Sequence, residues 1–297
     1  MSRRRYAILD VFTDRALAGN PLAVVLDGEG LGDTAMQAIA AEFNLSETVF
    51  VLPPADPRHR AALRIFTPGR ELPFAGHPTV GTAVLLGILD HGGAPATAAF
   101  GLEEKVGLVP CTVAVQGDST GASTFTLPRL PAEIAEPATT AAIAVAVGLD
   151  AADIGFDGHV PSVFSAGVGF TYVPVRSREA VTRARVQADG WAAIKPADHA
   201  NAFLYTREAS EPGHAFHARM FAPGLGISED PATGSAVGGG RLRRRGDAVR
   251  PACRWGPHAG RGAGLCDGPA VADPARAQRH GWRADAGDHW RIGNRHR

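Results

Sequence analysis

The sequence predicts an α/β (α+β) fold of two pseudo-symmetric domains, each with strands wrapped around a central helix. Two observations support this prediction. The motif R-x-F-x-P-G occurs twice, at 64–69 and at 219–224. The first copy precedes a segment, 80–89, that is apolar on every side of a helix. Such a helix is buried, and strands must therefore surround it. The length of 297 residues also favours two domains over one.

The first half of the chain alternates strand-like and helical segments. Asp33 is expected to cap a helix over 33–43, which carries its apolar residues on one face. The central helix is expected to begin at His77-Pro78 and to end at Gly92-Gly93, because proline suits a first turn and glycine a helix end. Four β-rich segments read as the strands that precede it: 6–11, 22–26, 48–52 and 61–67.

The second half follows a proline-rich stretch, 127–137, which reads as the crossing between domains. A helix is expected over 142–147, and strands over 160–175, 202–206 and 217–221. The predicted organisation is an N-terminal domain over 1–127, a second and truncated homologous domain over 138–237, and an atypical tail over 238–297.

The two copies of the repeat share more than their first six residues. A small-residue motif follows each copy, Ala75-Gly76-His77 in the first and Thr233-Gly234-Ser235 in the second. Each half therefore reads as strand, turn, glycine and start of a central helix. If the halves face each other, two helix N-termini point into one cleft. Their free N–H groups would favour an anion there, most simply a carboxylate.

Composition excludes several classes of protein. No run approaches the roughly 18 apolar residues of a membrane-spanning helix. The three cysteines, Cys111, Cys253 and Cys266, are too few and too widely spaced for a disulfide framework or a zinc site. No metal site is therefore expected, and a cytoplasmic location is the default.

Four segments carry a family resemblance. They are DVFTDRALAGNPLAVVL (10–26), AEFNLSETVFVLP (41–53), RIFTPGRELPFAGHPTVGTA (64–83) and FAPGLGISEDPATGSA (221–236). Together, in this order, they resemble the PhzF-like family, which includes the phenazine-biosynthesis isomerase and shares the diaminopimelate-epimerase fold. The resemblance implies an active site between two domains. It also implies no metal, no organic cofactor, a small-molecule substrate, and a homodimer.

The resemblance assigns Glu47, in NLSETVF, as the catalytic acid/base. On its own, a carboxylate at this element junction would more simply face solvent. Its apolar neighbours Phe43, Leu45 and Phe50 favour the partial burial that brings a carboxyl pKa towards working pH.

The resemblance assigns substrate binding to six other positions. Four of them have a structural alternative: a packed or capping histidine, a turn aspartate, a helix-start serine, and a turn asparagine in GNP. Gly76 and Gly234 would allow close approach of the backbone to the substrate. The assigned residues are His77, Asp230, Ser235, Gly76, Gly234 and, as a pocket or scaffold residue, Asn20.

The residue types favour a proton shift over stereoinversion. Racemases of this fold need two bases on opposite faces of a carbon, usually two thiols, but His77 and Ser235 stand at the two helix starts here. One glutamate can remove a proton and return it to another carbon on the same face. Two alternatives stay open: an epimerase or racemase with Asp230 as second base, and a degenerate relative without activity.

The family pattern stops at about Val237. Residues 238–297 hold 13 Arg and 12 Gly but only five Val, Leu or Ile, with a net charge of +8 against −8 for the rest. A segment so poor in apolar residues is not expected to fold natively. We interpret it as a frameshift product, which puts the activity of this polypeptide in doubt. The alternative is a basic arm for nucleic acid, but neither lysine nor a binding motif supports it.

Overall fold

The computed structural model divides into two units, Met1–Thr126 with Ala272–Arg297 (unit 1) and Leu127–Val271 (unit 2). Each unit combines helices with a sheet, which confirms the predicted α+β class. Most of the predicted unfolded tail, 238–297, lies outside the described residues; only backbone in a few segments is described there. The described residues are 3–13, 16–17, 19–126, 131–194, 200–209 and 216–239, with the strands Ala263–Leu265, Arg276–Asp285 and His289–Gly293.

Unit 1 is built on a sheet that, within the described residues, has ten strands in the order β17-β16-β1-β2-β3-β4-β6-β7-β8, with β5 beside β4. Two pairs, β2 with β3 and β4 with β6, are parallel, and the other pairs are antiparallel. The elements are β1 (Arg5–Val11), β2 (Asn20–Val25), α1 (Asp33–Phe43), β3 (Glu47–Leu52), β4 (Ala61–Phe66), β5 (Glu71–Leu72), α2 (Gly76–Asp90), β6 (Ala96–Glu104), β7 (Gly107–Val115), β8 (Gly121–Phe125), β16 (Arg276–Asp285) and β17 (His289–Gly293).

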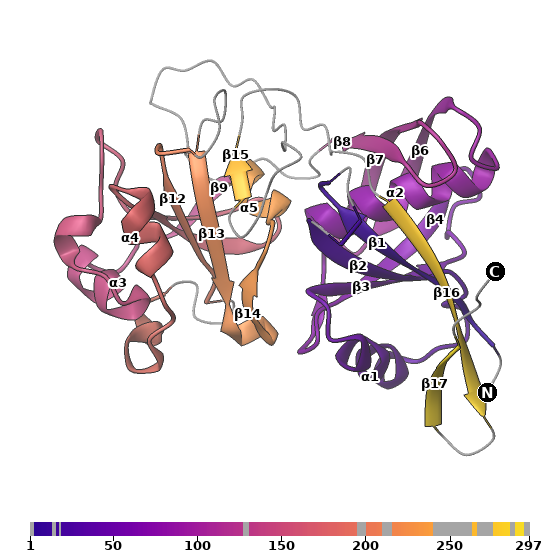
Figure 1. Ribbon diagram of the computed structural model, residues 1–297, viewed down its shortest axis with the longest axis horizontal. Helices are drawn as coiled ribbons and strands as arrows, with labels where there is room; N and C mark the ends of the chain where they lie inside the picture. Colours follow the sequence, from indigo (N-terminus) through magenta and orange to yellow (C-terminus); the bar gives the residue numbers. More distant parts are fainter. Residues whose placement is uncertain are drawn as a thin grey trace. The chain divides into compact units, whose positions relative to one another are not determined.

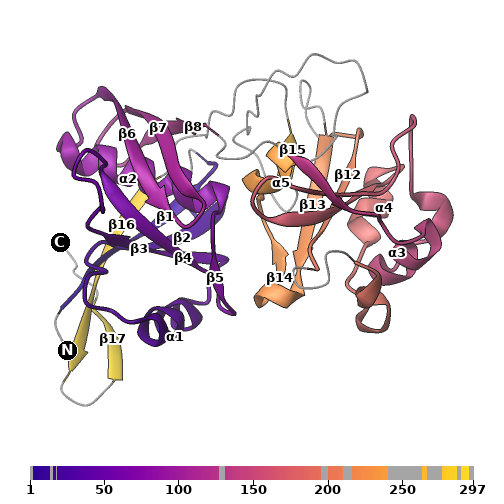
Figure 2. The same cartoon turned by 180° about the vertical axis from the view of Figure 1, so that it is seen from behind.

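Helix α2 is the predicted central helix, and all of its residues from Gly76 to Ile88 are buried. It contacts β1, β2 and β3 as well as β6, β7 and β8, and the strands lie around it in both ribbon views (Figures 1 and 2). A Cβ at Gly81 would lie 2.8 Å from side-chain carbons of Leu22 and Val11. Glycine therefore lets the helix pack directly on β1 and β2, where each fully buried aliphatic side chain contributes about 1.5–3 kcal/mol.

Helix α1 covers a different face of the unit 1 strands. Met36 and Ala40 of the helix are buried against Tyr6, Phe50 and Phe66. The prediction that Asp33 caps this helix is wrong. The N-cap residue is Gly32, so no side-chain hydrogen bond caps the helix. Asp33 is the first residue of the helix, and its carboxylate forms an ion pair of 2.6 Å with Arg64.

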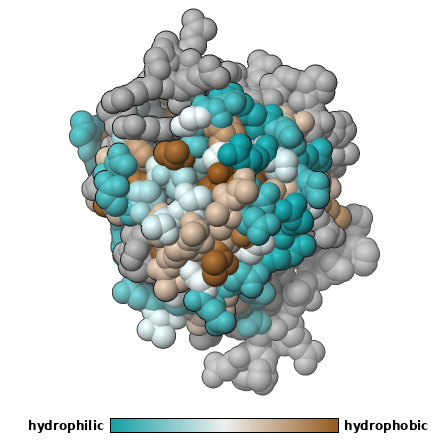
Figure 3. All heavy atoms as spheres, turned by 90° about the vertical axis from the view of Figure 1, so that its left-hand side faces the viewer, coloured by the Kyte–Doolittle hydropathy of each residue, from teal (hydrophilic) through white to brown (hydrophobic). Residues whose placement is uncertain are grey.

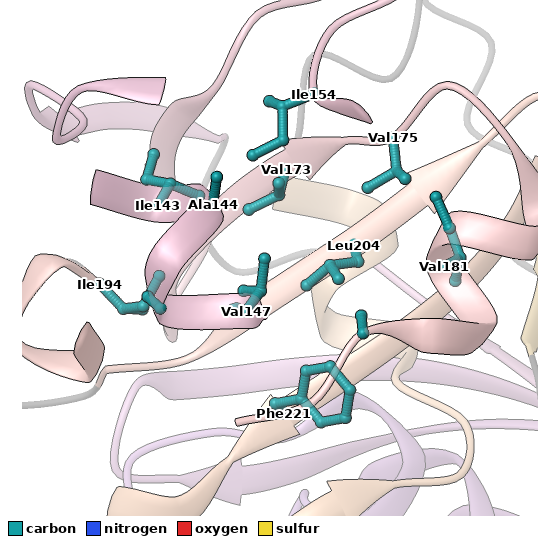
Figure 4. Close-up of a cluster of buried hydrophobic side chains, with 14 residues drawn as sticks. Ile143, Ala144, Val147, Ile154, Val173, Val175, Val181, Ile194, Leu204 and Phe221 are labelled. Carbon is teal, nitrogen blue, oxygen red and sulfur yellow. The ribbon is translucent and has the colours of Figure 1, made fainter. Parts of the chain in front are cut away.

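Unit 2 contains a seven-stranded sheet among its described residues, in the order β14-β13-β12-β11-β10-β9, with β15 beside β13. Its apolar core joins α3 and α4 to β11, β12 and β13 through Ile143, Val173, Val181, Leu204 and Phe221 (Figure 4). The elements are β9 (Ala132–Ala135), α3 (Thr140–Val147), β10 (Ser162–Ser165), β11 (Gly169–Pro174), α4 (Arg178–Arg183), β12 (Ala202–Thr206), β13 (Phe216–Ala222), β14 (Ile227–Asp230), α5 (Gly234–Gly239) and β15 (Ala263–Leu265), with short 3-10 turns at Ala151–Asp153, Ala188–Ala193 and Pro223–Leu225.

The outer face of unit 2 that carries α3 and α4 has a mixed surface. Small hydrophobic areas lie between hydrophilic residues in the space-filling view (Figure 3). Scattered exposed apolar residues of this kind are normal on a folded surface and do not by themselves mark a docking site.

The predicted single strand over 160–175 is wrong in one respect. The segment forms two antiparallel strands, β10 and β11, in which Ser165 pairs with Gly169. The chain reverses at the small residues Ala166 and Gly167. Both strands are largely buried, and their sequence is almost continuously apolar. The turn between them is therefore not apparent from the sequence pattern.

The internal repeat is present in the contacts as well as in the sequence. Arg64 on β4 pairs with Glu71 at 2.7 Å, and Arg219 on β13 pairs with Glu229 at 2.7 Å. Each arginine also lies over the phenylalanine two positions later on its own strand, at 5.1 Å and 4.7 Å from the ring centre. Each ion pair joins its strand to the short strand that precedes a glycine-led helix.

A single buried hydroxyl ties α5 to the unit 2 sheet. Tyr172 is 1% exposed on β11, and its hydroxyl donates a 2.6 Å hydrogen bond to the carbonyl of Ala236, which is itself fully buried. Replacing Tyr172 by Phe should lower the free energy of unfolding by about 1–3 kcal/mol, because the carbonyl loses its donor. Urea unfolding would measure this loss, and an unchanged midpoint would show that this hydrogen bond does not stabilise the fold.

Candidate active site

Three elements of unit 1 begin at the same place, and each has a polar side chain at its first or second residue. Asn20 is the first residue of β2, Glu47 is the first residue of β3, and His77 lies in the first turn of α2. Strands β2 and β3 are parallel, with Leu22 opposite Glu47, so their starts share one edge. Element ends next to a rigid framework are where functional residues concentrate.

Glu47 and His77 are in contact. The Oε2 atom of Glu47 is 3.2 Å from Nδ1 of His77, and the two side chains are 12% and 4% exposed. The amide nitrogen of Asn20 is 3.5 Å from the same Nδ1 atom, and the ring of Phe12 is 6.4 Å from the imidazole. The 3.2 Å separation is within reach of proton transfer, which often becomes better aligned when a substrate binds.

Burial keeps His77 neutral. Loss of hydration lowers the pKa of this imidazole from 6.5 to about 3, and a hydrogen bond to the backbone of Pro21 opposes that change. A neutral imidazole has one N–H donor and one acceptor nitrogen. Proline has no N–H, so the Pro21 carbonyl accepts the single imidazole proton, and Oε2 of Glu47 lies 3.2 Å from Nδ1 without a hydrogen bond to it.

An NMR titration of the imidazole signals tests this state. We expect no titration of His77 between pH 5 and 8. The unfolded chain takes up a proton near pH 6.5 and the folded chain does not, so stability should fall as pH is lowered from 6.5 towards 3, by at most about 1.4 kcal/mol per pH unit. A His77 midpoint above pH 6 would contradict the neutral assignment.

The start of α2 is suited to an anion. Ala75 is the N-cap and supplies no side-chain acceptor. The N–H groups of Gly76 and His77 belong to the first turn, where no intrahelical carbonyl is available. The helix dipole adds partial positive charge at the same point. A carboxylate bound there would lie beside Glu47 and His77.

The other predicted residues lie in unit 2. Asp230 ends β14 and is 5% exposed, and the hydroxyl of Thr233 donates to its carboxylate. Gly234 and Ser235 begin α5, which the structure describes only to Gly239. The structure thus groups Glu47, Gly76 and His77 in one unit, and Asp230, Gly234 and Ser235 in the other.

The sequence did not identify every residue of interest here. Phe12 and Pro21, which contact His77, fall inside a matched segment but carry no chemical signal of their own. The sequence analysis also did not single out Glu104, the last residue of β6, or Thr79, in the first turn of α2. Their contact joins positions 25 residues apart, and no motif marks it.

An open hollow of about 450 Å³ elsewhere in unit 1 contains neither Glu47 nor His77. Its arginines are already engaged, Arg4 with the carbonyls of Asp27 and Glu29, and Arg60 with Asp90. The chemistry of the Glu47–His77 pair makes that pair, rather than this hollow, the candidate site.

No group of three or more His, Cys, Asp or Glu side chains among the described residues is placed to hold a metal ion. No helix in the described part of the chain is long and apolar enough to cross a membrane.

Comparison with known proteins identifies the family. The family described as phenazine biosynthesis-like protein (PhzC-PhzF) matches residues 9–247. An uncharacterised isomerase of Mesorhizobium japonicum is 48% identical, over 80% of this chain and 79% of its own. The trans-2,3-dihydro-3-hydroxyanthranilate isomerase of Pseudomonas aeruginosa is 35% identical, over 79% and 77%. A solved structure from Pseudomonas aeruginosa, described as a predicted epimerase, aligns with a TM-score of 0.70 at 33% identity, over 93% and 96%.

These matches first define a class, that of isomerase- and epimerase-type proteins. More narrowly, the chain belongs to the phenazine biosynthesis-like (PhzC-PhzF) family. The family match ends at residue 247, so residues 248–297 lie beyond it.

Proposed function

We propose that this protein is a cofactor-independent isomerase that shifts a proton on a small carboxylate-bearing substrate, with Glu47 as the acid/base. One observation carries the proposal: the Glu47 carboxylate lies 3.2 Å from a buried, neutral His77 at the uncapped start of α2. The proposed base, Glu47, thus lies next to a neutral imidazole, His77. It also lies next to the N–H groups at the start of α2, where an anion can bind.

The proposed step conserves atoms and electrons. The Glu47 carboxylate removes a proton from one carbon of the substrate, and the electrons of that C–H bond form a new double bond as the old one shifts. The protonated Glu47 then returns the proton to the carbon at the far end of the conjugated system. His77 is proposed to shift its N–H from the Pro21 carbonyl to Oε2 of Glu47, 3.2 Å away, when substrate binds and Glu47 is ionised.

The substrate carboxylate is proposed to bind the N–H groups at the start of α2, where Gly76 leaves the backbone open. Asp230, Gly234 and Ser235 are proposed as further substrate contacts, with Asp230 hydrogen-bonding a polar group of the substrate. The name of the relative from Pseudomonas aeruginosa indicates a cyclic carboxylate substrate. We therefore propose a similar cyclic or enolisable carboxylate here. We also propose, from the family resemblance, that two copies of this chain form a homodimer.

An epimerase is the second candidate, because one solved relative is described as a predicted epimerase. Inversion at one carbon would need a second base opposite Glu47. Among the predicted site residues only Asp230 has a side chain of suitable chemistry, and Thr233 already donates to it.

An assay separates the two functions. The purified chain would be incubated with trans-2,3-dihydro-3-hydroxyanthranilate and, separately, with L-proline, with NMR and chiral chromatography as readouts. A version with a corrected frame after codon 237 would be tested in parallel. We expect the frame-corrected form to move the double bond of the first compound and to leave L-proline unchanged. Racemisation of L-proline, or no reaction by either form, would contradict the proposal.

A further inference from the structure

Glu104 is a buried carboxyl group that the proposed chemistry does not use. It ends β6, is 8% exposed, and its Oε1 atom lies 2.7 Å from the hydroxyl oxygen of Thr79 on α2. Its other oxygen, Oε2, has no hydrogen-bond partner within the described part of the chain. A buried carboxylate in such surroundings is costly unless it is protonated.

The proton count in this cluster favours a neutral Glu104. The Thr79 hydroxyl also lies 2.8 Å from the carbonyl oxygen of Ala75, which can only accept. A hydroxyl has one proton to donate. If Glu104 were ionised, it would compete with Ala75 for that proton. If Glu104 is protonated, both hydroxyl protons have an acceptor. Glu104 donates to the Thr79 hydroxyl, and Thr79 donates to the carbonyl of Ala75.

The surroundings of Glu104 support the same state. Burial raises the pKa of its carboxyl to about 8, against the smaller effect of the hydrogen bond with Thr79. Cys111 on β7 is the titratable group that faces it; burial and the Glu104 charge raise the pKa of that thiol to about 12, so Cys111 stays neutral. Lys105, the next residue, pairs with Glu71, and His77 on α2 is neutral at these pH values.

The hydrogen-bond chain ends at the peptide that begins the candidate anion site. The carbonyl of Ala75 and the N–H of Gly76 belong to one planar peptide unit and point in opposite directions. That carbonyl accepts from both the backbone N–H and the hydroxyl of Thr79. These bonds fix the plane of the peptide, and hydrogen bonds in series polarise one another. The Gly76 N–H is thereby held pointing out of the helix start.

We propose that Glu104 is a positioning residue that, as a neutral acid and through Thr79, orients the Gly76 N–H to bind the substrate carboxylate. The inference rests on the proposed function, because it assumes that a carboxylate binds at the start of α2. It adds a residue that no motif marked. It also adds a pH limit, because ionised Glu104 takes the Thr79 hydroxyl proton and leaves the Ala75 carbonyl with only the Thr79 N–H as a donor.

Isosteric variants of Thr79 test the inference. Thr79→Val removes the hydroxyl and keeps the shape, and Thr79→Ser restores the hydroxyl. We expect Thr79→Val to raise both KM and the Kd for benzoate roughly tenfold, with a smaller change in kcat, because one hydrogen bond to a charged ligand is misaligned. Thr79→Ser should stay within about twofold of the wild type.

Glu104→Gln tests the protonation state. The amide can still donate to Thr79 but cannot ionise. We expect benzoate affinity of the wild type to fall above about pH 8 and that of Glu104→Gln to stay constant. An infrared difference spectrum, wild type minus Glu104→Gln at pH 6, should show the C=O stretch of a protonated carboxyl group.

The outcomes distinguish this inference from the proposed function. Equal benzoate affinity in Thr79→Val and wild type, equal weakening in Thr79→Val and Thr79→Ser, or a carboxylate band for Glu104 would each overturn the inference. So would a wild-type chain that does not bind benzoate. If benzoate binds and Thr79→Val weakens it while no substrate is isomerised, the positioning role stands and the proposed function fails.

Discussion

Replacing Glu47 by Gln should lower kcat/KM by about 10²–10⁴-fold, which is the usual contribution of a general acid/base. The amide is close to isosteric with the carboxyl group but can neither accept nor return a proton. It can still contact Nδ1 of His77, from which Oε2 is now 3.2 Å away, so KM should change much less than kcat. Substrate depletion measured under initial-rate conditions gives both constants.

The control for this variant is Glu42→Gln, which makes the same chemical change on the exposed face of α1. It should keep full activity. Glu47→Asp should retain partial activity, since it keeps the carboxylate but withdraws it from His77. If Glu47→Gln retains more than about a tenth of wild-type activity, another residue is the base.

Replacing Gly19 by Ala should destabilise unit 1 by roughly 2–4 kcal/mol. Gly19 has φ +78°, and an added Cβ would lie 2.2 Å from the carbonyl oxygen of Val11. Backbone must therefore move where β1 passes into β2. Asn20, the next residue, pairs with Val11 and lies 3.5 Å from His77, so the shift should also disturb the candidate site.

Thermal and urea unfolding measure the loss, and Gly32→Ala is the matched control. Gly32 has φ −82°, and an added Cβ would meet nothing within 4 Å. Because Gly32 is an N-cap residue, Gly32→Ala should lower the free energy of unfolding by less than about 1 kcal/mol. Similar losses in the two variants would show that the strained turn at Gly19 does not constrain unit 1.

The sequence predicts those features of the fold that depend on local pattern. The central helix α2, apolar on every side, and the strand before it both have local signatures, and the repeated R-x-F-x-P-G motif marks corresponding ion pairs of Arg64 and Arg219. The turn inside 160–175 was missed because two buried strands in succession read as one apolar run.

Features that depend on contacts between residues far apart in the sequence could not be predicted. The hairpin of β6 and β7 has no strong turn signal of its own, and it was not assigned. Asp33 was expected to cap α1, but Arg64, 31 residues away, binds its carboxylate instead. Glu104 reads as one of three charged residues at a surface turn, and only its contact with Thr79 shows that it is buried.

For the candidate site, the motif NLSETVF and the helix start AGHP located Glu47 and His77, and the structure places them in contact. The neutral state of His77 depends on burial by β2 and α2 together, which no single segment encodes. The roles of Asp230, Gly234 and Ser235 stay predictions.

The frameshift hypothesis for the tail stays a prediction. The family match ends at residue 247, and the sequence pattern breaks at about Val237. The coding DNA around codons 230–250, read in all three frames, should contain an apolar helix in another frame. If no frame restores such a helix, the tail is authentic and the hypothesis is wrong.

The central claim is that one carboxylate carries a proton between two carbons, and isotope tracing tests it most directly. Trans-2,3-dihydro-3-hydroxyanthranilate would be converted in D₂O, and the product and the remaining substrate analysed by NMR. We predict that deuterium, where it enters, appears at the carbon that gains a proton, that unreacted substrate keeps its configuration, and that Glu47→Gln forms product at least about 10²-fold more slowly. Deuterium in inverted substrate, or labelled product formed by Glu47→Gln at more than about a tenth of the wild-type rate, would contradict the claim.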